Sequence, residues 1–239
     1  MVNLTNQNQE QEFLKIQNQL REKICLSDDC YPGFAPDQIR TVAGIDLAYW
    51  NQDQQEFAVC CIVVLDFRTH EILEKKQYHD RITVPYMPGF LAFRELPLIL
   101  KTVELLEHKP ELYVFDGNGY LHPRHMGIAT HAAFYLNTPT IGVAKTYFRV
   151  DQKTDYTEPE QTAGSYTDII IDGEIYGRTL RTHSGVKPVF VSAGNGISLD
   201  TATALTLRLV GSESRIPIPT RLADLETHTA RSELLCRQL

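Results

Sequence analysis

The sequence predicts a single α/β domain, built on a mixed β-sheet with helices on its faces. Three β-rich segments follow one another between residues 42 and 84, which indicates an antiparallel meander. A strand, a helix and a strand with short connections follow between residues 112 and 144, which predicts a parallel unit. The chain has 239 residues, 43% of them hydrophobic, so it can bury a full core without a second domain. We therefore expect residues 1–239 to form one domain.

The N-terminal segment has the spacing of an amphipathic helix. Its apolar residues recur at steps of three or four between residues 8 and 26. They are Phe13, Ile16, Leu20 and Ile24. We expect this helix, within residues 1–30, to pack on the rest of the domain. A stretch with two prolines and a glycine, residues 32–36, then separates it from the first strand.

The predicted meander consists of three segments rich in strand-forming residues. They are VAGIDLAYW at 42–50, EFAVCCIVVLDF at 56–67 and EILEKKQYHDRITV at 71–84. Helical spacing resumes over residues 90–106.

The predicted parallel unit begins after Pro110. Two short apolar runs, LYVF at 112–115 and TIGVA at 140–144, flank a segment with helical spacing at 124–136. In such sheets, ligand sites gather beyond the carboxyl ends of the strands.

The last third of the chain begins with an acidic stretch. Residues 151–174 contain seven carboxylates and one lysine, which indicates an exposed insert ending in the strand TDIIID. A further strand, KPVFVS at 187–192, and helices at 199–210 and 222–235 complete the prediction.

The five cysteines have no spacing typical of a zinc site. Cys60 and Cys61 are adjacent in an apolar strand and should face opposite sides of the sheet. We expect all five to be reduced thiols. The first residues, MVNLTNQNQEQEF, are polar and lack the apolar segment of a signal peptide. A cytoplasmic protein without a membrane segment is therefore expected.

Positive charge is concentrated locally in a chain whose formal net charge is -7. The residues between Asp116 and Asp151 include no acid, yet they include Arg124, Lys145, Arg149 and three histidines. An acidic isoelectric point would usually disfavour nucleic acid, but the field at a site depends on where the charges lie. A cationic segment beside one carboxylate suits a metal ion and a phosphate.

Two aspartates have the same setting at the end of an apolar strand. Asp46 follows VAGI and Asp116 follows LYVF, and a divalent cation would relieve the repulsion between two such acids. Oxygen ligands without a Cys or His cluster favour Mg²⁺ or Mn²⁺ over zinc. Glu95 and Asp224 are the best further candidates. Any one of these acids alone could instead cap a helix or end a strand in solvent.

The basic residues allow several interpretations. Lys145, at the end of TIGVA, could neutralise charge that develops on a phosphate or position a water, or be a solvated lysine. His122, in the turn LHPR, could contact a phosphate or be a loop histidine satisfied within the protein. Other cations could follow a phosphate backbone or be ordinary surface charges. They are Arg124, Arg178, Arg181, Lys187 and Arg221.

The turn PYMPG holds a tyrosine stiffly. Tyr86 lies between Pro85 and Pro88, and a rigid aromatic ring in a surface turn suits stacking on a base or insertion into a base step. The alternative is a turn whose ring packs on the domain.

Six segments, taken together and in order, resemble the endonuclease V family. They are VAGIDLAY, PYMPGFLAFRE, FDGNGYLHPRHMGIATH, PTIGVAK, KPVFVS and PTRLAD, and they extend from about residue 40 to residue 225. The resemblance implies a ribonuclease H-like fold. It also implies an enzyme that uses Mg²⁺, with Mn²⁺ as a substitute, to hydrolyse the second phosphodiester bond 3′ to a deaminated purine, such as deoxyinosine, in DNA.

The same resemblance assigns roles to individual residues. The metal ligands would be Asp46, Glu95 and Asp116, and the catalytic set would also include Lys145 and Asp224. Tyr86 and Pro88 would belong to a wedge that keeps the strands apart beside the lesion. The pocket for the extruded base would involve Gly89, Leu91 and Gly117, and His122 and Arg124 would also contact the substrate.

The chain departs from the family pattern at three positions. His125 replaces the second arginine of the usual His-Pro-Arg-Arg, Asn195 replaces a histidine, and Ile218 stands where many relatives have glutamate. These positions lie outside the predicted acids, so they bear on substrate preference and pH response more than on the chemistry.

Two other functions agree with the sequence. Some members of this family act on inosine in RNA, and the choice depends on how the site treats a 2′-hydroxyl. A nucleic-acid-binding module with a disused site is the other, although the retained acids and Lys145 count against it. In each case we expect a monomer that binds nucleic acid and no membrane.

Overall fold

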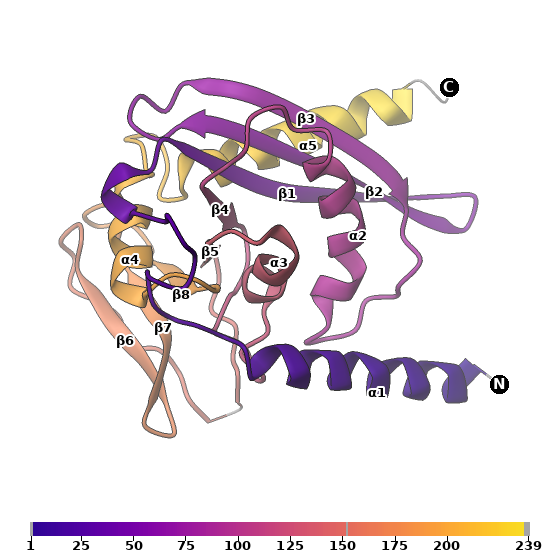
Figure 1. The fold of residues 1–239 in the computed structure, drawn as a ribbon, viewed down its shortest axis with the longest axis horizontal. Coiled ribbons are helices and arrows are strands. Elements are labelled where there is room, and N and C mark those ends of the chain that lie inside the picture. The colour runs from indigo at the N-terminus through magenta and orange to yellow at the C-terminus, as the bar shows by residue number, and fades with distance from the viewer. Residues whose placement is uncertain (1, 152, 237–239) are drawn as a thin grey trace.

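An eight-stranded mixed sheet forms the centre of the computed structural model, which describes residues 2–151 and 153–236 (Figure 1). The strands are β1 (Thr41–Gln52), β2 (Gln55–Asp66), β3 (Ile72–Arg81), β4 (Leu112–Phe115), β5 (Thr140–Ala144), β6 (Tyr166–Ile171), β7 (Glu174–Leu180) and β8 (Val189–Ala193). The helices are α1 (Val2–Arg21), α2 (Leu91–Val103), α3 (Ile128–Leu136), α4 (Leu199–Arg208) and α5 (Ile218–Cys236), with a short 3₁₀ turn at Pro36–Gln38. None of these helices is long and apolar enough to cross a bilayer.

The order of the strands is β3-β2-β1-β4-β5-β8-β7-β6. Strands β1, β2 and β3 form the predicted antiparallel meander. Strand β4 is parallel to both β1 and β5, with α3 as the connection between β4 and β5. The predicted mixed α/β sheet is therefore confirmed, and β4 is the strand at which the meander meets the parallel unit.

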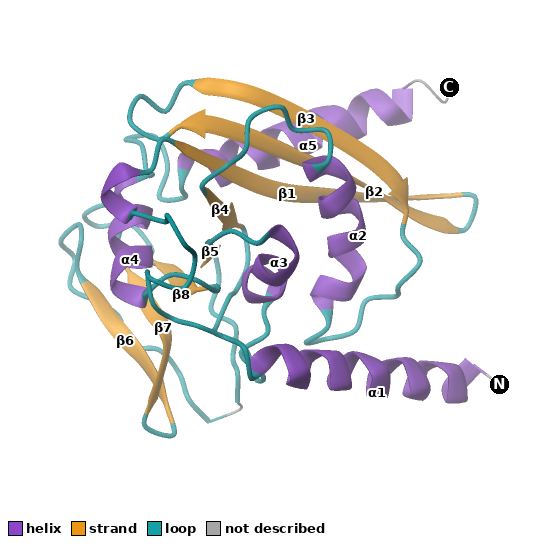
Figure 2. Ribbon diagram, in the orientation of Figure 1, coloured by secondary structure: helices purple, strands orange, loops and turns teal. Residues whose placement is uncertain are grey.

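Helices cover both faces of the sheet (Figures 1 and 2). Helices α2 and α3 contribute to one apolar cluster with alternate residues of β1 and β2, and α4 and α5 contribute to clusters on the other face. Cys60 belongs to the first cluster and Cys61 to the second face, as their adjacent positions in a strand predict.

Strand β7 was not predicted, because its sequence EIYGRTL is short and interrupted by glycine. It nevertheless pairs with β6 on one side and β8 on the other. Helix α3 begins at Ile128 rather than at residue 124, because His125 has a φ of 57° and residues 122–127 form turns. Helix α1 covers Val2–Arg21 instead of 8–26, whereas α5 begins four residues before the predicted start.

The expectation of five reduced cysteines is wrong for Cys25 and Cys30, which form a disulfide. The residues between them make a turn, and this turn brings the two Cα atoms to 6.1 Å. Asn195 holds this segment in place. Its Oδ1 accepts a hydrogen bond from the Cys25 backbone N–H at 2.7 Å, and its Nδ2 donates to the Tyr31 hydroxyl at 3.1 Å. The departure at position 195 therefore has a structural role.

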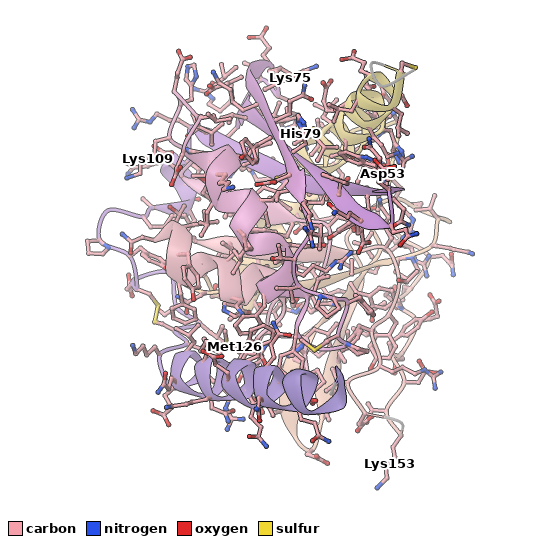
Figure 3. All side chains as sticks on the ribbon, turned by 90° about the vertical axis from the view of Figure 1, so that its right-hand side faces the viewer. Asp53, Lys75, His79, Lys109, Met126 and Lys153 are labelled. Atoms are coloured by element: carbon pink, nitrogen blue, oxygen red, sulfur yellow. A yellow bond between two sulfur atoms is a disulfide. The ribbon has the colours of Figure 1, made fainter. Side chains whose placement is uncertain are left out.

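Acids of the insert pair with two arginines in and just after strand β7. Arg178 pairs with Asp168 and Asp200 at 2.9 and 2.6 Å, and Arg181, which is 3% exposed, pairs with Glu158 at 2.8 Å. Both side chains are buried and paired within the protein, so neither interpretation left open for these two arginines, a phosphate contact or an ordinary surface charge, describes them. Near the start of the insert, Lys153 projects away from the body (Figure 3).

Candidate active site

The pairing of β1 with β4 brings two predicted acids together. Ile45 lies opposite Phe115 in the parallel register, so that Asp46 and Asp116, the next residue of each segment, occupy neighbouring positions. Strand β4 ends at Phe115, and the Asp116 carboxylate therefore lies beyond the carboxyl end of a buried strand, where ligand sites form in such sheets. Strand β1 continues to Gln52, so the predicted place of Asp46 at a strand end is wrong.

Lys145 follows strand β5 and joins this pair. Its Nζ lies 2.6 Å from Oδ2 of Asp116 and 3.9 Å from Oδ2 of Asp224. Burial lowers the pKa of the Lys145 ammonium, but the hydrogen bond and the charge of Asp116, followed by the charges of Asp224 and Asp46, raise it above its usual value. Lys145 is therefore a fixed cation among carboxylates.

Helix α5 supplies Asp224 and also holds Asp46. The Thr227 hydroxyl donates to Oδ2 of Asp46 at 2.8 Å. This helix approaches β1 closely at Gly44, where an added Cβ would lie 2.0 Å from the backbone carbon of Pro219. The glycine of VAGID and the proline of PTRLAD thus meet, which explains why two distant motifs share one site.

Glu95 comes from α2, on the other face of the sheet. Its Oε1 accepts a hydrogen bond from the Tyr49 hydroxyl at 2.6 Å, and the guanidinium of the neighbouring Arg94 lies 4.6 Å from the centre of the Tyr49 ring. Arg94 is itself buried and pairs with Glu56 at 2.5 Å. The Tyr49 hydroxyl therefore fixes one side of the Glu95 carboxylate, and Arg94 packs against the Tyr49 ring.

The acids influence one another electrostatically. Burial raises the pKa of Asp46 to about 6; the Thr227 hydrogen bond opposes this, and the charges of Asp224 and Asp116 add to it. Burial likewise raises the pKa of Glu95 to about 7, with the charges of Asp46 and Asp116 adding to the effect. These carboxylates are poorly compensated by the protein, as is common at functional sites.

Each acid has a protein partner of its own. Within residues 2–151 and 153–236, no three His, Cys, Asp or Glu side chains come close enough together to share a metal ion. The Lys145 ammonium forms an ion pair with Asp116. The Tyr49 hydroxyl donates a hydrogen bond to one oxygen of Glu95, and the Thr227 hydroxyl donates one to Asp46. The donor set nevertheless suits a hard divalent cation, because it consists of carboxylate oxygens that repel one another.

The turn with Tyr86 stands out from the surface. The Tyr86 side chain is 65% exposed, so the alternative in which its ring packs on the domain does not apply. Arg94 donates to the Val84 carbonyl at 2.9 Å on one side of the turn. On the other side, Arg124 donates to the Gly89 carbonyl at 2.7 Å. The turn is thus firmly held at both ends.

His122 and Arg124 are engaged within the protein. The Nδ1 atom of His122 accepts from the backbone N–H groups of Arg124 and Met126 at 3.2 and 3.3 Å. Burial, helped by the Arg124 charge, lowers the pKa of His122 to about 3, so this ring is neutral at ordinary pH. The structure shows both residues organising the loop after Asp116, and their contact with substrate stays a prediction.

A model of the endonuclease V family matches residues 18–225 of the chain. The chain is also 56% identical over 223 residues to the endonuclease V of Bacillus subtilis (strain 168), covering 93% of this chain and 92% of that protein. The chain belongs to the endonuclease V family. It is thus a DNA-repair nuclease of the deoxyribonuclease V type.

Solved endonuclease V structures have the same fold. The crystal structure from Bacillus subtilis superimposes with a TM-score of 0.90 at 54% identity, covering 95% of this chain and 94% of that chain. The Ciona intestinalis endonuclease V, in complex with a 24mer DNA containing an inosine followed by a ribo-adenosine, gives 0.84 at 28% identity, with 95% and 99% covered. The sheet is therefore ribonuclease H-like, as the resemblance implied.

The family motifs did not reveal the residues that hold the acids. Thr227 lies three residues after Asp224 on α5, so both residues share one face of the helix, and this spacing could have identified it. Tyr49 lies three residues after Asp46 in a strand, and its side chain therefore points to the opposite face. Sequence spacing gave no signal that it would meet Glu95.

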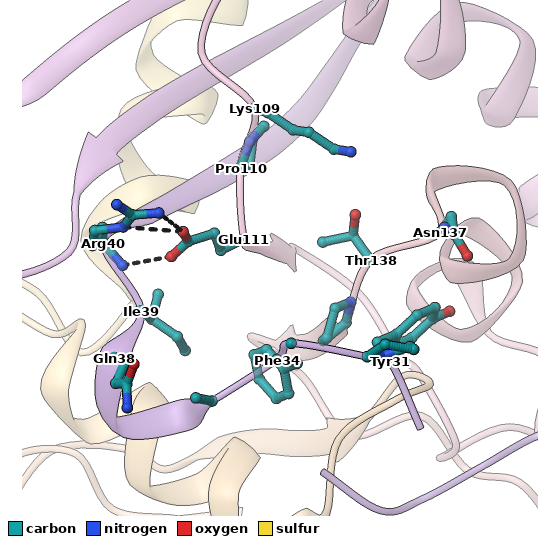
Figure 4. A pocket seen from close by; sticks show the side chains of 14 residues that line it. Tyr31, Phe34, Gln38, Ile39, Arg40, Lys109, Pro110, Glu111, Asn137 and Thr138 are labelled. Atoms are coloured by element: carbon teal, nitrogen blue, oxygen red, sulfur yellow. Dashed lines mark hydrogen bonds and ion pairs between the residues drawn. The ribbon is translucent and has the colours of Figure 1, made fainter. Parts of the chain in front are cut away.

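A cavity of about 810 Å³ lies at the other end of the sheet from the acids (Figure 4). Its walls include Phe34, Pro110 and Thr138, and an Arg40–Glu111 ion pair of 3.0 Å lies at its edge. These residues precede the amino ends of β1, β4 and β5. None of the predicted site residues lines this cavity.

Proposed function

We propose that this endonuclease V hydrolyses the second phosphodiester bond 3′ to a deaminated purine, such as deoxyinosine, in DNA and leaves a nick. The observation that carries the proposal is the placement of Asp46, Asp116 and Asp224 around Lys145 at one open sheet edge. The Ciona intestinalis complex adds support, because that relative binds an inosine-containing nucleic acid.

Mg²⁺, with Mn²⁺ as a substitute, is the metal that the donor set favours. Asp46, Glu95 and Asp116 would hold it, with Asp224 as a further carboxylate. When bound, such an ion would stabilise negative charge on the phosphate and activate a water. Burial, together with the charges of neighbouring acids, raises the pKa values of Asp46 and Glu95, and a bound cation would favour their ionised forms.

The protein groups have separate tasks in this scheme. Thr227 and Tyr49 fix the orientation of Asp46 and Glu95 through hydrogen bonds of 2.8 and 2.6 Å. Lys145 is the cation nearest to Asp116, at 2.6 Å, and it would lie beside a phosphate bound at this edge of the sheet. Its ammonium would then stabilise the charge that develops on the leaving oxygen.

Recognition of the lesion would take place at the turn with Tyr86. A deaminated adenine pairs poorly, so extruding it from the duplex costs less than extruding a normal base. Tyr86 and Pro88, both exposed, would enter the space beside it. Gly89, Leu91 and Gly117 would then line the pocket for the extruded base.

Cleavage of inosine-containing RNA is a second candidate. It is supported by the Ciona intestinalis relative, whose structure is a complex with a DNA that contains an inosine followed by a ribo-adenosine. His122 and Arg124 would contact the substrate near the same loop in either case.

A cytoplasmic location and a monomeric state stay predictions from the sequence.

The test uses duplex DNA with one deoxyinosine and, separately, single-stranded RNA with one inosine. Each is incubated with Mg²⁺ or with a chelator, and the nick is mapped at nucleotide resolution. The proposal expects a nick at the second bond 3′ to deoxyinosine, only with metal. Cleavage of the RNA alone would favour the second candidate, and cleavage in the presence of chelator would contradict both.

A further inference from the structure

Helix α1 packs against the elements that carry the exposed turn. It runs beneath α2 and α3 (Figure 1), and the ring of Phe13 stacks on Phe93 of α2 at 3.9 Å between centroids and 6° between planes. The same ring lies 6.0 Å from Phe90, the first residue after the turn. The N-terminal helix is therefore fixed to the base of the turn by aromatic contacts.

Gln17 is the polar residue at the centre of this contact. It is fully buried, at 0% exposure. Its Nε2 donates to the Gly89 carbonyl at 3.0 Å, and its Oε1 accepts from Nε of Arg124 at 2.5 Å. Arg124 also donates to the Gly89 carbonyl at 2.7 Å. Three segments far apart in the sequence thus form one closed set of hydrogen bonds.

The Gly89 carbonyl determines how the turn leaves the surface. Gly89 has a φ of +80°, and an added Cβ would lie 2.8 Å from Nη2 of Arg124, so that only glycine fits here. The backbone N–H of Phe90 donates to the Met87 carbonyl at 3.0 Å and closes the turn. Two donors, one from Gln17 and one from Arg124, therefore fix the peptide between Gly89 and Phe90, at the end of the turn.

We propose that Gln17 is a positioning residue for lesion recognition in duplex DNA. It acts through Arg124 and Gly89, and it sets the direction in which Tyr86 enters the duplex. The inference rests on the proposed function and gives α1 a part in that function. Truncation of Gln17 leaves the Gly89 carbonyl with one donor and the partly buried Nε of Arg124 without its acceptor, and small displacements of a positioning group lower rates strongly.

A wedge has a task only where two strands must be kept apart. A single-stranded substrate presents the lesion without a partner strand, so its cleavage does not depend on the direction of Tyr86. The ratio of kcat/KM for a deoxyinosine duplex to kcat/KM for the same single strand therefore reports the wedge. A general loss of folded protein lowers both values equally and leaves this ratio unchanged.

The test compares Gln17→Ala with Gln19→Ala. Gln19 is the same residue type on the same helix and is exposed, so it serves as the matched control. We expect Gln17→Ala to lower the duplex to single-strand ratio about tenfold, mainly through KM for the duplex, and Gln19→Ala to leave the ratio unchanged. Gln17→Glu keeps an acceptor for Arg124 and gives the same direction of change if the alanine variant does not fold.

A double variant makes the test specific to the turn. In a Tyr86→Ala background, Gln17→Ala should lower the ratio little further, because the two residues act through one element. Equal losses on duplex and single strand, an unchanged ratio, or fully additive effects of the two substitutions would each overturn the inference. Failure of the proposed function is distinguishable, because the unsubstituted enzyme would then nick neither deoxyinosine substrate.

Discussion

Glu74 on β3 and the acids at the carboxyl edge of the sheet are the same kind of group in opposite circumstances. Glu74, whose side chain is 8% exposed, accepts the backbone N–H groups of Glu107 and His108 at 3.0 and 2.8 Å and pairs with Lys76 at 3.2 Å. Burial alone would raise its pKa, but these donors lower it to about 2. The fold stabilises this negative charge.

Asp46 and Glu95 have fewer donors and more negative neighbours. Each accepts one hydroxyl, from Thr227 and Tyr49 respectively. Burial raises their pKa values to about 6 and about 7, and the charge of Asp116 contributes to both. The comparison shows that the fold can satisfy a carboxylate completely and yet leaves these acids short of positive charge, as expected where function and stability have different requirements.

The largest effect should come from removing the site acids. We expect Asp46→Asn and Asp116→Asn each to lower nicking of a deoxyinosine duplex by at least about 10³-fold, because the amide cannot replace a negative metal ligand. Binding to the damaged DNA should stay measurable in a mobility-shift assay. Cutting at nearly the parental rate by either variant would mean that the assigned roles are wrong.

The free energy of unfolding of Asp46→Asn measures how much the ionised Asp46 carboxylate destabilises the fold. A folded pKa of about 6, above the ordinary value of 3.8, means that ionised Asp46 disfavours folding above about pH 6 and that this cost disappears below about pH 4. We therefore expect the variant to gain about 2 to 3 kcal/mol in free energy of unfolding at about pH 8. Urea denaturation with chelator at about pH 8 and pH 4 measures it, and a loss at the higher pH would contradict the comparison.

Glu74→Gln should have the opposite sign. A pKa lowered from 4.5 to about 2 contributes stability above about pH 4.5 that is lost as the pH falls toward 2. Allowing for solvent screening near the surface, we expect a loss of about 2 kcal/mol at neutral pH with normal nicking. The control is Glu107→Gln, since Glu107 shares Lys76 but is 80% exposed, and it should change stability little. Equal losses of unfolding free energy in Glu74→Gln and Glu107→Gln would mean that the buried Glu74 carboxylate has no special stabilising role.

Tyr86→Ala separates recognition from chemistry and should have the smallest effect. The ring is exposed and outside the acid cluster, so we expect preference for deoxyinosine over intact duplex to fall about tenfold while the dependence of nicking on Mg²⁺ concentration is unchanged. Cleavage of both duplexes across a metal series measures this. A shifted metal dependence would place Tyr86 in the chemistry.

The sequence predicted most of the fold, because hydrophobic periodicity marks strands and helices that bury one face. The meander and the β4–α3–β5 unit follow from this rule, and the parallel register then places Asp46 beside Asp116. Strand β7 escaped prediction because EIYGRTL lacks clear alternation. Arg178 in this strand and Arg181 just after it are buried, which the sequence did not indicate because their partners lie in other segments.

The site was predictable as far as its motifs extend along the chain. Asp116 and Lys145 follow strands β4 and β5, and Asp46 lies in β1 beside them, in apolar segments that a pattern can locate. The supporting contacts of Tyr49, Thr227 and Gln17 depend on how helices pack across the sheet, and no local pattern encodes them. The disulfide of Cys25 and Cys30 likewise depends on a turn docked by Asn195.

The most direct test of the account is a calorimetric titration of Mg²⁺ into the parent protein, Asp46→Asn and Glu74→Gln at about pH 8. If the carboxylates at the sheet edge lack positive charge because they serve a divalent cation, Asp46→Asn binds Mg²⁺ at least about tenfold more weakly, and Glu74→Gln binds it like the parent. Equal Mg²⁺ affinity in the parent and in Asp46→Asn would contradict the account.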